Sequence, residues 1–201
     1  MAVRAPAALL AALALAGCGT GADKQIAGGG QLGGRTLTVY SLTRDPYGAT
    51  RDEVDGEKLA LQQAHGKVGS LLVNFAAFDL GTSTAAAAGA TQRAIEDPQI
   101  IAAVVDATPV TVPLLNAAGV LQVAPGGDAA LGSDPQATPS GRRTLAPLAP
   151  GTVPAGFAAA FQAAFGRAPT AQARTGYRAM QTILRAIGRG GNDRTQVIRA
   201  Y

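Results

Sequence analysis

The stretch SLLVNFAAFDLGTSTAAAAGATQRAIEDPQIIAAVVD, residues 70–106, decides the fold of this chain. It begins with a largely apolar run at 70–79 and ends with a β-branched run at 100–106, and both runs have the length of buried strands. The Ala-rich segment between them, 83–97, predicts a helix that ends before Pro98. This order indicates two parallel strands joined by a crossover helix.

The same alternation continues on both sides of that unit. Further strands are expected at 36–42 and 120–125, and further helices at 51–65 and 109–119. We therefore expect an α/β fold in three layers, α/β/α, built on a doubly wound parallel sheet. Ligands of such sheets bind beside the carboxyl ends of the strands. In this chain those ends are followed by the loops 43–50, 79–84, 106–111 and 126–131.

The first residues of the chain are typical of an export signal. Arg4 precedes an apolar run that is too short to span a bilayer as a stable helix. The run ends in Leu-Ala-Gly-Cys, residues 15–18, which resembles the lipobox of bacterial lipoproteins. We expect a signal peptide at 1–17, lipidation of Cys18 and a protein anchored to the extracytoplasmic face of the bacterial cell membrane. The Gly-rich residues 18–35 are interpreted as a tether.

Composition argues against several classes of function. The net charge of +4 is spread along 201 residues, with no basic block interleaved with aromatics, so no nucleic-acid partner is expected. With one His and one Cys there is no cluster of metal-ligand residues, and we expect neither a metal site nor a cofactor. His65 is interpreted as a solvated residue at a helix end. The serines lack nucleophile-elbow spacing and a paired His, so no enzymatic activity is expected.

Two other groups of residues receive structural interpretations. Asp79 and Asp106 end strands at the carboxyl edge, where we expect them to cap loops rather than to form an acid–base pair. The late segment has apolar residues at helical spacing, which predicts that they belong to the core. These residues are Tyr177, Met180, Leu184 and Ile187.

Four segments together resemble a known family. GEKLALQQAHGKVGSLLVNFAAFD (56–79), ATQRAIEDPQIIAAVVD (90–106) and VPLLNAAGVLQVAPGGDAAL (112–131) are similar to the first lobe of type I periplasmic binding proteins. The segment GFAAAFQAAFGRAPTAQARTGYRAMQTILRAIGRGGNDRTQVIRAY (156–201) is similar to that family's late segment. The likeness points to the substrate-binding lipoproteins of branched-chain amino acid ABC transporters. It implies one lobe of the type I fold.

The resemblance also implies that a second lobe is missing. Family members have about twice this length and two lobes that close over a ligand. Here SGRRTLAPLAP (140–150) resembles the strand leading into the second lobe, yet the late first-lobe helix follows within a few residues, and no return into that lobe follows Tyr201. We therefore divide the mature chain into a first-lobe domain at 36–132, a Pro/Gly-rich junction replacing the second lobe at 133–153 and C-terminal helices completing the first lobe at 154–201.

The family's ligand loops suggest a site. Its first lobe holds the α-amino and α-carboxylate groups of an amino acid with hydroxyl and backbone groups from two loops. The first loop corresponds to residues 105–111, which are shorter and lack the family's Gly and Ser, and the second to residues 124–128. The resemblance thus implies ligand contacts from five residues: Thr108, Thr111, Gly126, Gly127 and Asp128. An Asp in this loop would repel a carboxylate and could pair with an amino group.

Three interpretations of function stay open. The first is a non-enzymatic solute-binding-type lipoprotein for a small molecule such as leucine, isoleucine or valine, with an ABC permease or another membrane protein as partner. The second is a single-lobe interaction or sensory module that uses the surface once covered by the second lobe to form a homodimer or to dock a membrane partner. The third is the product of a decayed or internally deleted gene.

Overall fold

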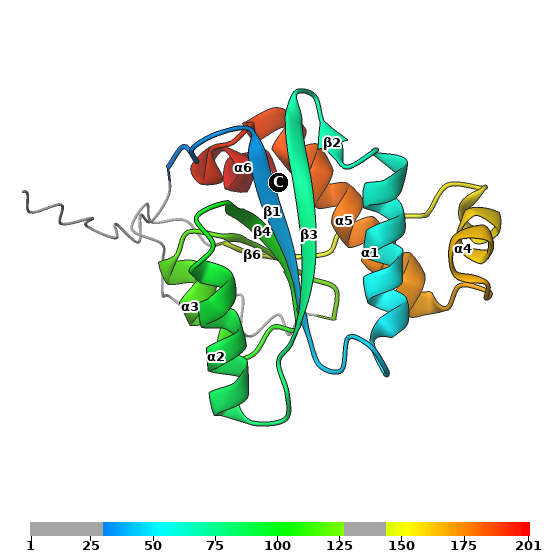
Figure 1. Cartoon of the computed structure of the whole chain (residues 1–201), viewed down its shortest axis with the longest axis horizontal. Helices are drawn as coiled ribbons and strands as arrows, with labels where there is room; N and C mark the ends of the chain where they lie inside the picture. Colours follow the sequence, from blue (N-terminus) through cyan, green and yellow to red (C-terminus); the bar gives the residue numbers. More distant parts are fainter. Residues whose placement is uncertain (1–29, 127–143) are drawn as a thin grey trace, which may run out of the picture.

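The computed structural model describes residues 30–126 and 144–201, which form one mixed sheet covered by helices on both faces (Figure 1). The six strands lie in the order β2-β3-β1-β4-β5-β6. All neighbouring pairs are parallel except the short antiparallel pair β2–β3. The strand bounds are β1 Thr36–Thr43, β2 Lys67–Val68, β3 Leu71–Asp79, β4 Ile100–Val105, β5 Leu121–Ala124 and β6 Leu145–Pro147.

The helices form two layers with separate apolar cores. α2 (Thr84–Ile95) and α3 (Thr111–Ala117) cover one face, where Leu42 and Leu115 are fully buried. α1 (Arg51–Gln63), α5 (Ala171–Gly190) and α6 (Arg194–Ala200) cover the other face, with α4 (Phe157–Phe165) packed outside α1 in Figure 1. The predicted three-layer α/β/α architecture of one lobe is therefore confirmed.

Two glycines allow α1 and α5 to cross at very short distance. A Cβ atom on Gly56 would lie 2.0 Å from the carbonyl oxygen of Ala173, and one on Gly176 would lie 2.0 Å from the carbonyl oxygen of Glu53. The backbones of the two helices are therefore in direct contact, and a side chain at Gly56 or Gly176 would overlap the other helix. Around this crossing, α5 buries Tyr177, Met180, Leu184 and Ile187, as its apolar spacing predicts.

Most predicted elements form close to their expected bounds, and the differences have local causes. The helix expected at 109–119 spans only Thr111–Ala117, because residues 108–110 form a turn closed by hydrogen bonds between Thr108 and Thr111. Residues 30–35, which were expected to belong to the tether, make backbone contacts with the segment between α5 and α6. Leu32 N–H donates to Asn192 O at 2.7 Å, and Gln31 forms a β-bridge to Asp193.

The expected junction at 133–153 contains a strand of the sheet. β6 pairs in parallel with β5, with Val123 opposite Ala146. The buried side chain of Gln122 connects β5 to the residue before β6 and to α3. Its Nε2 donates to Thr144 Oγ1 at 2.7 Å and to Asn116 Oδ1 at 2.9 Å. The strand that resembles the crossover into a second lobe therefore extends the sheet of the first lobe.

Candidate functional site

A cleft opens at the carboxyl edge of the sheet, between the loops that follow β3 and β4. Its volume is about 650 Å³, within the range of small-molecule sites. The lining residues come from the end of β1, the two loops and the first turn of α2: Arg44, Leu80, Gly81, Thr82, Ser83, Thr84, Ala87, Ala107, Thr108, Pro109 and Val110. This is the place where ligands bind in open α/β sheets.

The wall formed by the second loop is built on a reciprocal pair of threonines. Thr108 Oγ1 accepts from the backbone N–H of Thr111 at 3.1 Å, and Thr111 Oγ1 accepts from the N–H of Thr108 at 3.0 Å. Such an exchange satisfies backbone donors that the first helical turn would otherwise leave unpaired. Of these two predicted ligand residues, Thr108 lines the cleft, whereas Thr111 is fully buried and also donates to Asp106 O at 3.0 Å.

The two strand-end aspartates hold the loops in place. Asp79 Oδ1 accepts from the backbone N–H groups of Gly81 at 2.7 Å and Asp45 at 3.1 Å, and these donors lower the pKa of Asp79. Asp106 Oδ2 accepts from Thr43 Oγ1 at 3.1 Å and from the N–H of Arg44 at 3.0 Å. Both carboxylates bond their own or a neighbouring loop, as expected from their positions.

Gly126 is the other predicted ligand residue that the structure describes. It is exposed just after β5 and does not line the cleft. Gly127, Asp128 and the lipidation residue Cys18 lie outside the described residues. Contacts of Thr108, Thr111 and these glycines with a ligand stay predictions.

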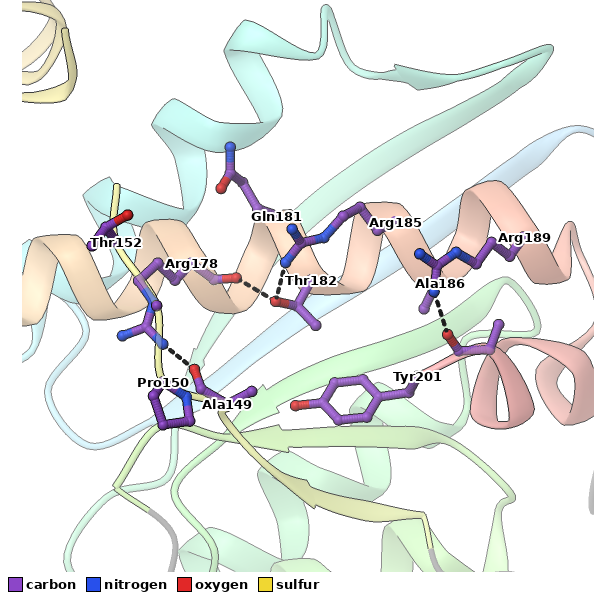
Figure 2. A pocket seen from close by; sticks show the side chains of 12 residues that line it. Ala149, Pro150, Thr152, Arg178, Gln181, Thr182, Arg185, Ala186, Arg189 and Tyr201 are labelled. Carbon is purple, nitrogen blue, oxygen red and sulfur yellow. Dashed lines mark hydrogen bonds between the residues drawn. The ribbon is translucent and has the colours of Figure 1, made fainter. Parts of the chain in front are cut away.

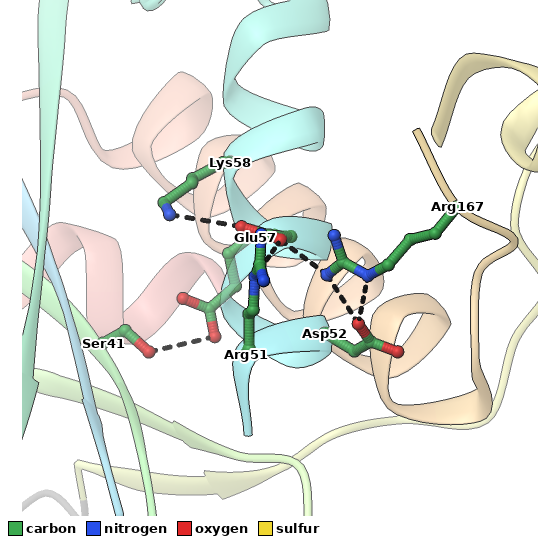
Figure 3. Close-up of polar contacts among 7 residues, drawn as sticks. Ser41, Arg51, Asp52, Glu57, Lys58 and Arg167 are labelled. Carbon is green, nitrogen blue, oxygen red and sulfur yellow. Dashed lines mark hydrogen bonds and ion pairs between the residues drawn. The ribbon is translucent and has the colours of Figure 1, made fainter. Parts of the chain in front are cut away.

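Buried carboxyl groups lie behind the cleft, on the α1 face of the sheet. Glu57 is fully buried, and its Oε1 accepts from Ser41 Oγ at 3.2 Å (Figure 3). Burial and the neighbouring Glu53 raise the pKa of Glu57 well above its usual range. Burial and the Asp106 carboxylate raise the pKa of Glu53 to about 7. No sequence signal separates these glutamates from solvated ones, because Glu57 is buried against Ser41 of β1 only once α1 packs on the sheet.

An ion-paired cluster fixes the outer side of the same helix. Arg167 donates from Nε and Nη2 to Asp52 Oδ1 at 2.9 and 2.6 Å, and from Nη2 to Asp55 Oδ2 at 2.7 Å (Figure 3). Its guanidinium also lies over the ring of Phe161, 5.4 Å from the centroid. These contacts connect the loop between α4 and α5 to α1, and so hold the scaffold behind the cleft.

The cleft offers hydrogen-bond donors to a small polar ligand. Thr82 and Thr84 are exposed on its wall, and the Arg44 side chain adds a cation beside them. Ser83 caps α2 by accepting from the N–H of Ala86 at 3.1 Å. The lining residues named above include no carboxylate. The arrangement therefore suits a ligand that presents oxygen acceptors to hydroxyl groups and a guanidinium.

Two further observations concern metal sites and membrane-spanning helices. Within residues 30–126 and 144–201, no three His, Cys, Asp or Glu side chains are grouped as a metal site would require. In the same part of the chain, no helix is both long and apolar enough to cross a bilayer.

The fold and the position of the cleft define one lobe of the type I periplasmic-binding-protein fold. Among solved structures, a protein described as a branched-chain amino acid ABC transporter from Rhodospirillum rubrum matches with a TM-score of 0.60 and 12% identity, over 82% of this chain and 88% of that chain. The branched-chain amino acid transporter substrate-binding protein LivJ from Streptococcus pneumoniae, solved with isoleucine, matches with a TM-score of 0.59 and 13% identity, over 82% of this chain and 87% of that chain.

These structural neighbours confirm the family resemblance at the level of fold. Neither a protein family model nor a curated protein sequence matches the chain. At 12 to 13% identity the likeness does not assign a ligand to this chain.

Proposed function

We propose that this chain is an extracytoplasmic, non-enzymatic solute-binding lipoprotein whose ligand lies in the carboxyl-edge cleft. The ligand class is a small amino acid of the leucine, isoleucine and valine type, and the partner is an ABC permease. The observation that carries the proposal is the cleft of about 650 Å³ between the loops 79–84 and 106–111, at the ligand position of this class of sheet.

The chemistry of the wall supports a carboxylate-bearing ligand. Thr84 and Thr108 present hydroxyl groups, and the guanidinium of Arg44 can form a charge-assisted hydrogen bond to a carboxylate. Because a single lobe covers one face of a ligand, it buries less ligand surface than a closed pocket does. We therefore expect dissociation constants of about 1 mM rather than the micromolar range.

Calorimetric titration with isoleucine, leucine and valine tests this proposal. Thr84→Val removes a cleft hydroxyl that makes no side-chain bond within the described residues, and it should weaken binding several-fold. Thr175→Val is the matched control, because Thr175 lies on α5, outside the cleft, and donates to Ala171 O. Equal affinities for the two variants, or no heat with any of the three amino acids, would count against binding in the cleft.

The membrane anchor is tested separately. If Cys18 carries the lipid, Cys18→Ala should move the protein from the membrane fraction to the soluble fraction of the cell. A variant that stays as firmly membrane-bound as the wild type would contradict the anchor without bearing on the cleft.

The interaction-module alternative has less support on the described surface. The large hydrophobic side chains exposed on the described surface are Tyr47, Leu72 and Tyr201. Tyr47 follows the carboxyl end of β1, whereas Leu72 lies at the amino end of β3, which is the opposite end of the sheet. Tyr201 donates to Pro147 O on the edge strand β6. These three residues do not form one apolar surface, which an obligate dimer would bury. The homodimer therefore stays a hypothesis.

A further inference from the structure

A second concave site, which shares no lining residue with the cleft, lies along the solvent side of α5. It is a groove of about 410 Å³ between α5 and the segment 149–152 that follows β6, with Ala200 and Tyr201 at one end (Figure 2). One wall is the helix and the other is extended chain, so the groove joins residues 26 to 40 positions apart in the sequence. None of the residues in the proposed solute site takes part in it.

Three arginines line the groove, and they come from one face of α5. Arg178, Arg185 and Arg189 are spaced by seven and four residues, which places them on the same side of a helix. Among the residues that the structure describes, no Asp or Glu lines the groove. In the part of the chain that the structure describes, none of the three forms an ion pair, whereas Arg167 and Arg51 do.

The hydrogen bonds of these three arginines within the described residues use few of their N–H groups. Arg178 donates to the backbone oxygen of Ala149, Arg185 to Thr182 Oγ1 at 3.0 Å and Arg189 to the oxygen of Ala200 at 3.3 Å. All of these acceptors are neutral. Each guanidinium has five N–H donors in a planar fork, so most donors in the groove are left for an anion. Figure 2 shows the three side chains on the same side of the helix.

We propose that this groove binds a polyanionic ligand through its phosphate groups. Three guanidiniums match a ligand of two or more negative charges, and a phosphate group carries about 1.5 to 2 charges at neutral pH. Arginine forks bind phosphate oxygens in pairs. The backbone positions of Arg185 and Arg189 are about 6 Å apart along the helix axis, and Arg178 lies about 10 Å beyond Arg185. A row of linked phosphates can therefore contact two or three of them together.

The side chains between the arginines add neutral donors. Gln181 and Thr182 lie on the helix wall and Thr152 lies on the opposite wall. These groups can bond phosphate oxygens that the arginines do not reach. The groove thus combines charge with a shape that excludes part of the solvent, which a flat basic surface does not.

Titration calorimetry of the full chain with inorganic tripolyphosphate, at about 0.15 M salt, tests the proposal. We expect saturable binding at one site. The double variant Arg185→Gln/Arg189→Gln should weaken it by at least about tenfold, because each lost fork removes a charge-assisted contact. The matched control is Arg174→Gln/Arg199→Gln, which lowers the net charge equally at exposed arginines outside the groove and should change the affinity less than about twofold.

Equal weakening in the two double variants would show attraction by bulk charge and would overturn the proposal. So would the absence of saturable binding by both tripolyphosphate and anionic lipid. Circular dichroism of each variant controls for folding, and Arg178→Gln gives an independent second variant.

Vesicle sedimentation distinguishes the two sources of phosphate. The Cys18→Ala chain is used, so that no acyl chain inserts into the vesicles. If vesicles of phosphatidylglycerol and phosphatidylcholine bind it, pure phosphatidylcholine vesicles do not, and tripolyphosphate competes, the groove holds lipid headgroup phosphates. If tripolyphosphate binds and the vesicles do not, the ligand is a soluble polyanion. Both outcomes support the phosphate site.

Discussion

The crossing of α1 and α5 gives the sharpest test of the fold behind the cleft. Gly176 lies near the start of α5, and a Cβ atom there would meet the carbonyl oxygen of Glu53 at 2.0 Å, its carbonyl carbon at 2.7 Å and its Cα at 3.0 Å. These are backbone atoms of a neighbouring helix, so they cannot rotate away. Gly176→Ala must therefore push the two helices apart.

Two opposing effects set the expected magnitude. Replacing a helical glycine with alanine favours folding by about 1 kcal/mol through helix propensity. Adding a methyl group to a packed contact costs about 1 to 3 kcal/mol, and more where the backbone must move. With a contact more than about 1 Å too short, the packing cost wins. We expect a net destabilisation of about 2 kcal/mol and a fall in Tm of roughly 4 to 8 °C.

Gly89→Ala is the matched control. Gly89 lies inside α2, where the nearest atom to an added Cβ is Arg93 Nη1 at 3.8 Å, the tip of a flexible side chain. The same substitution should therefore stabilise by about 0.5 to 1 kcal/mol. Urea unfolding followed by circular dichroism measures both free energies of unfolding. If Gly176→Ala were as stabilising as Gly89→Ala, the close crossing would be wrong.

The reciprocal contact at Gly56 extends the test. Gly56→Ala alone should destabilise by a similar amount, because its Cβ would lie 2.0 Å from Ala173 O. The double variant Gly56→Ala/Gly176→Ala should cost less than the sum of the two, since helices already separated by one methyl group accommodate the second more easily. Additive costs would show that the two contacts are independent.

Two more predictions concern the charged groups on α1. Burial and the Asp106 carboxylate raise the pKa of Glu53 from its ordinary 4.5 to about 7. The folded chain thus holds this proton more tightly than the unfolded chain, so the free energy of unfolding should fall by on the order of 3 kcal/mol as the pH rises from about 4.5 to about 7. Glu53→Gln should remove the Glu53 contribution from the fall measured in urea titrations at about pH 5 and pH 8, while the contribution of Glu57, whose pKa is also raised, remains. An unchanged pH dependence would refute the assignment. Arg167→Lys keeps the charge but loses the fork that bonds Asp52 and Asp55, and should lower the free energy of unfolding by about 1 to 2 kcal/mol. Arg174→Lys, at an exposed position without such contacts, should leave it unchanged, and equal effects of the two changes would contradict the bonded geometry.

The strands and long helices could be predicted from the sequence because each is a run with one clear period. β4 is buried at every position, and its predicted run of 100–106 differs from the observed strand by one residue. Local turn chemistry was harder to predict. Thr108 and Thr111 were expected to contact a ligand, but their hydroxyl groups also accept from each other's backbone N–H in the turn before α3, and no spacing rule separates these two uses of a threonine.

Features that depend on distant segments could not be predicted. The β6 strand has three residues, and its place beside β5 depends on a buried Gln122 that bonds Thr144 across the edge of the sheet. The arginine spacing on α5 is visible in the sequence, but the opposite wall of the groove comes from residues 149–152. In the same way, Glu57 is buried where α1 packs against β1, with Ser41 as its hydrogen-bond partner.

The proposed function requires that a single lobe form a solute site at the carboxyl edge of its sheet. A two-dimensional ¹H–¹⁵N NMR titration of the chain with isoleucine tests it most directly. Isoleucine should cause concentration-dependent shifts of the backbone amides of residues 80–84, 107, 108 and 110, which line the cleft. The amides of Arg185 and Arg189, in the groove along α5, should stay unchanged. Saturable shifts confined to other surfaces, or no shifts at any concentration, would contradict it.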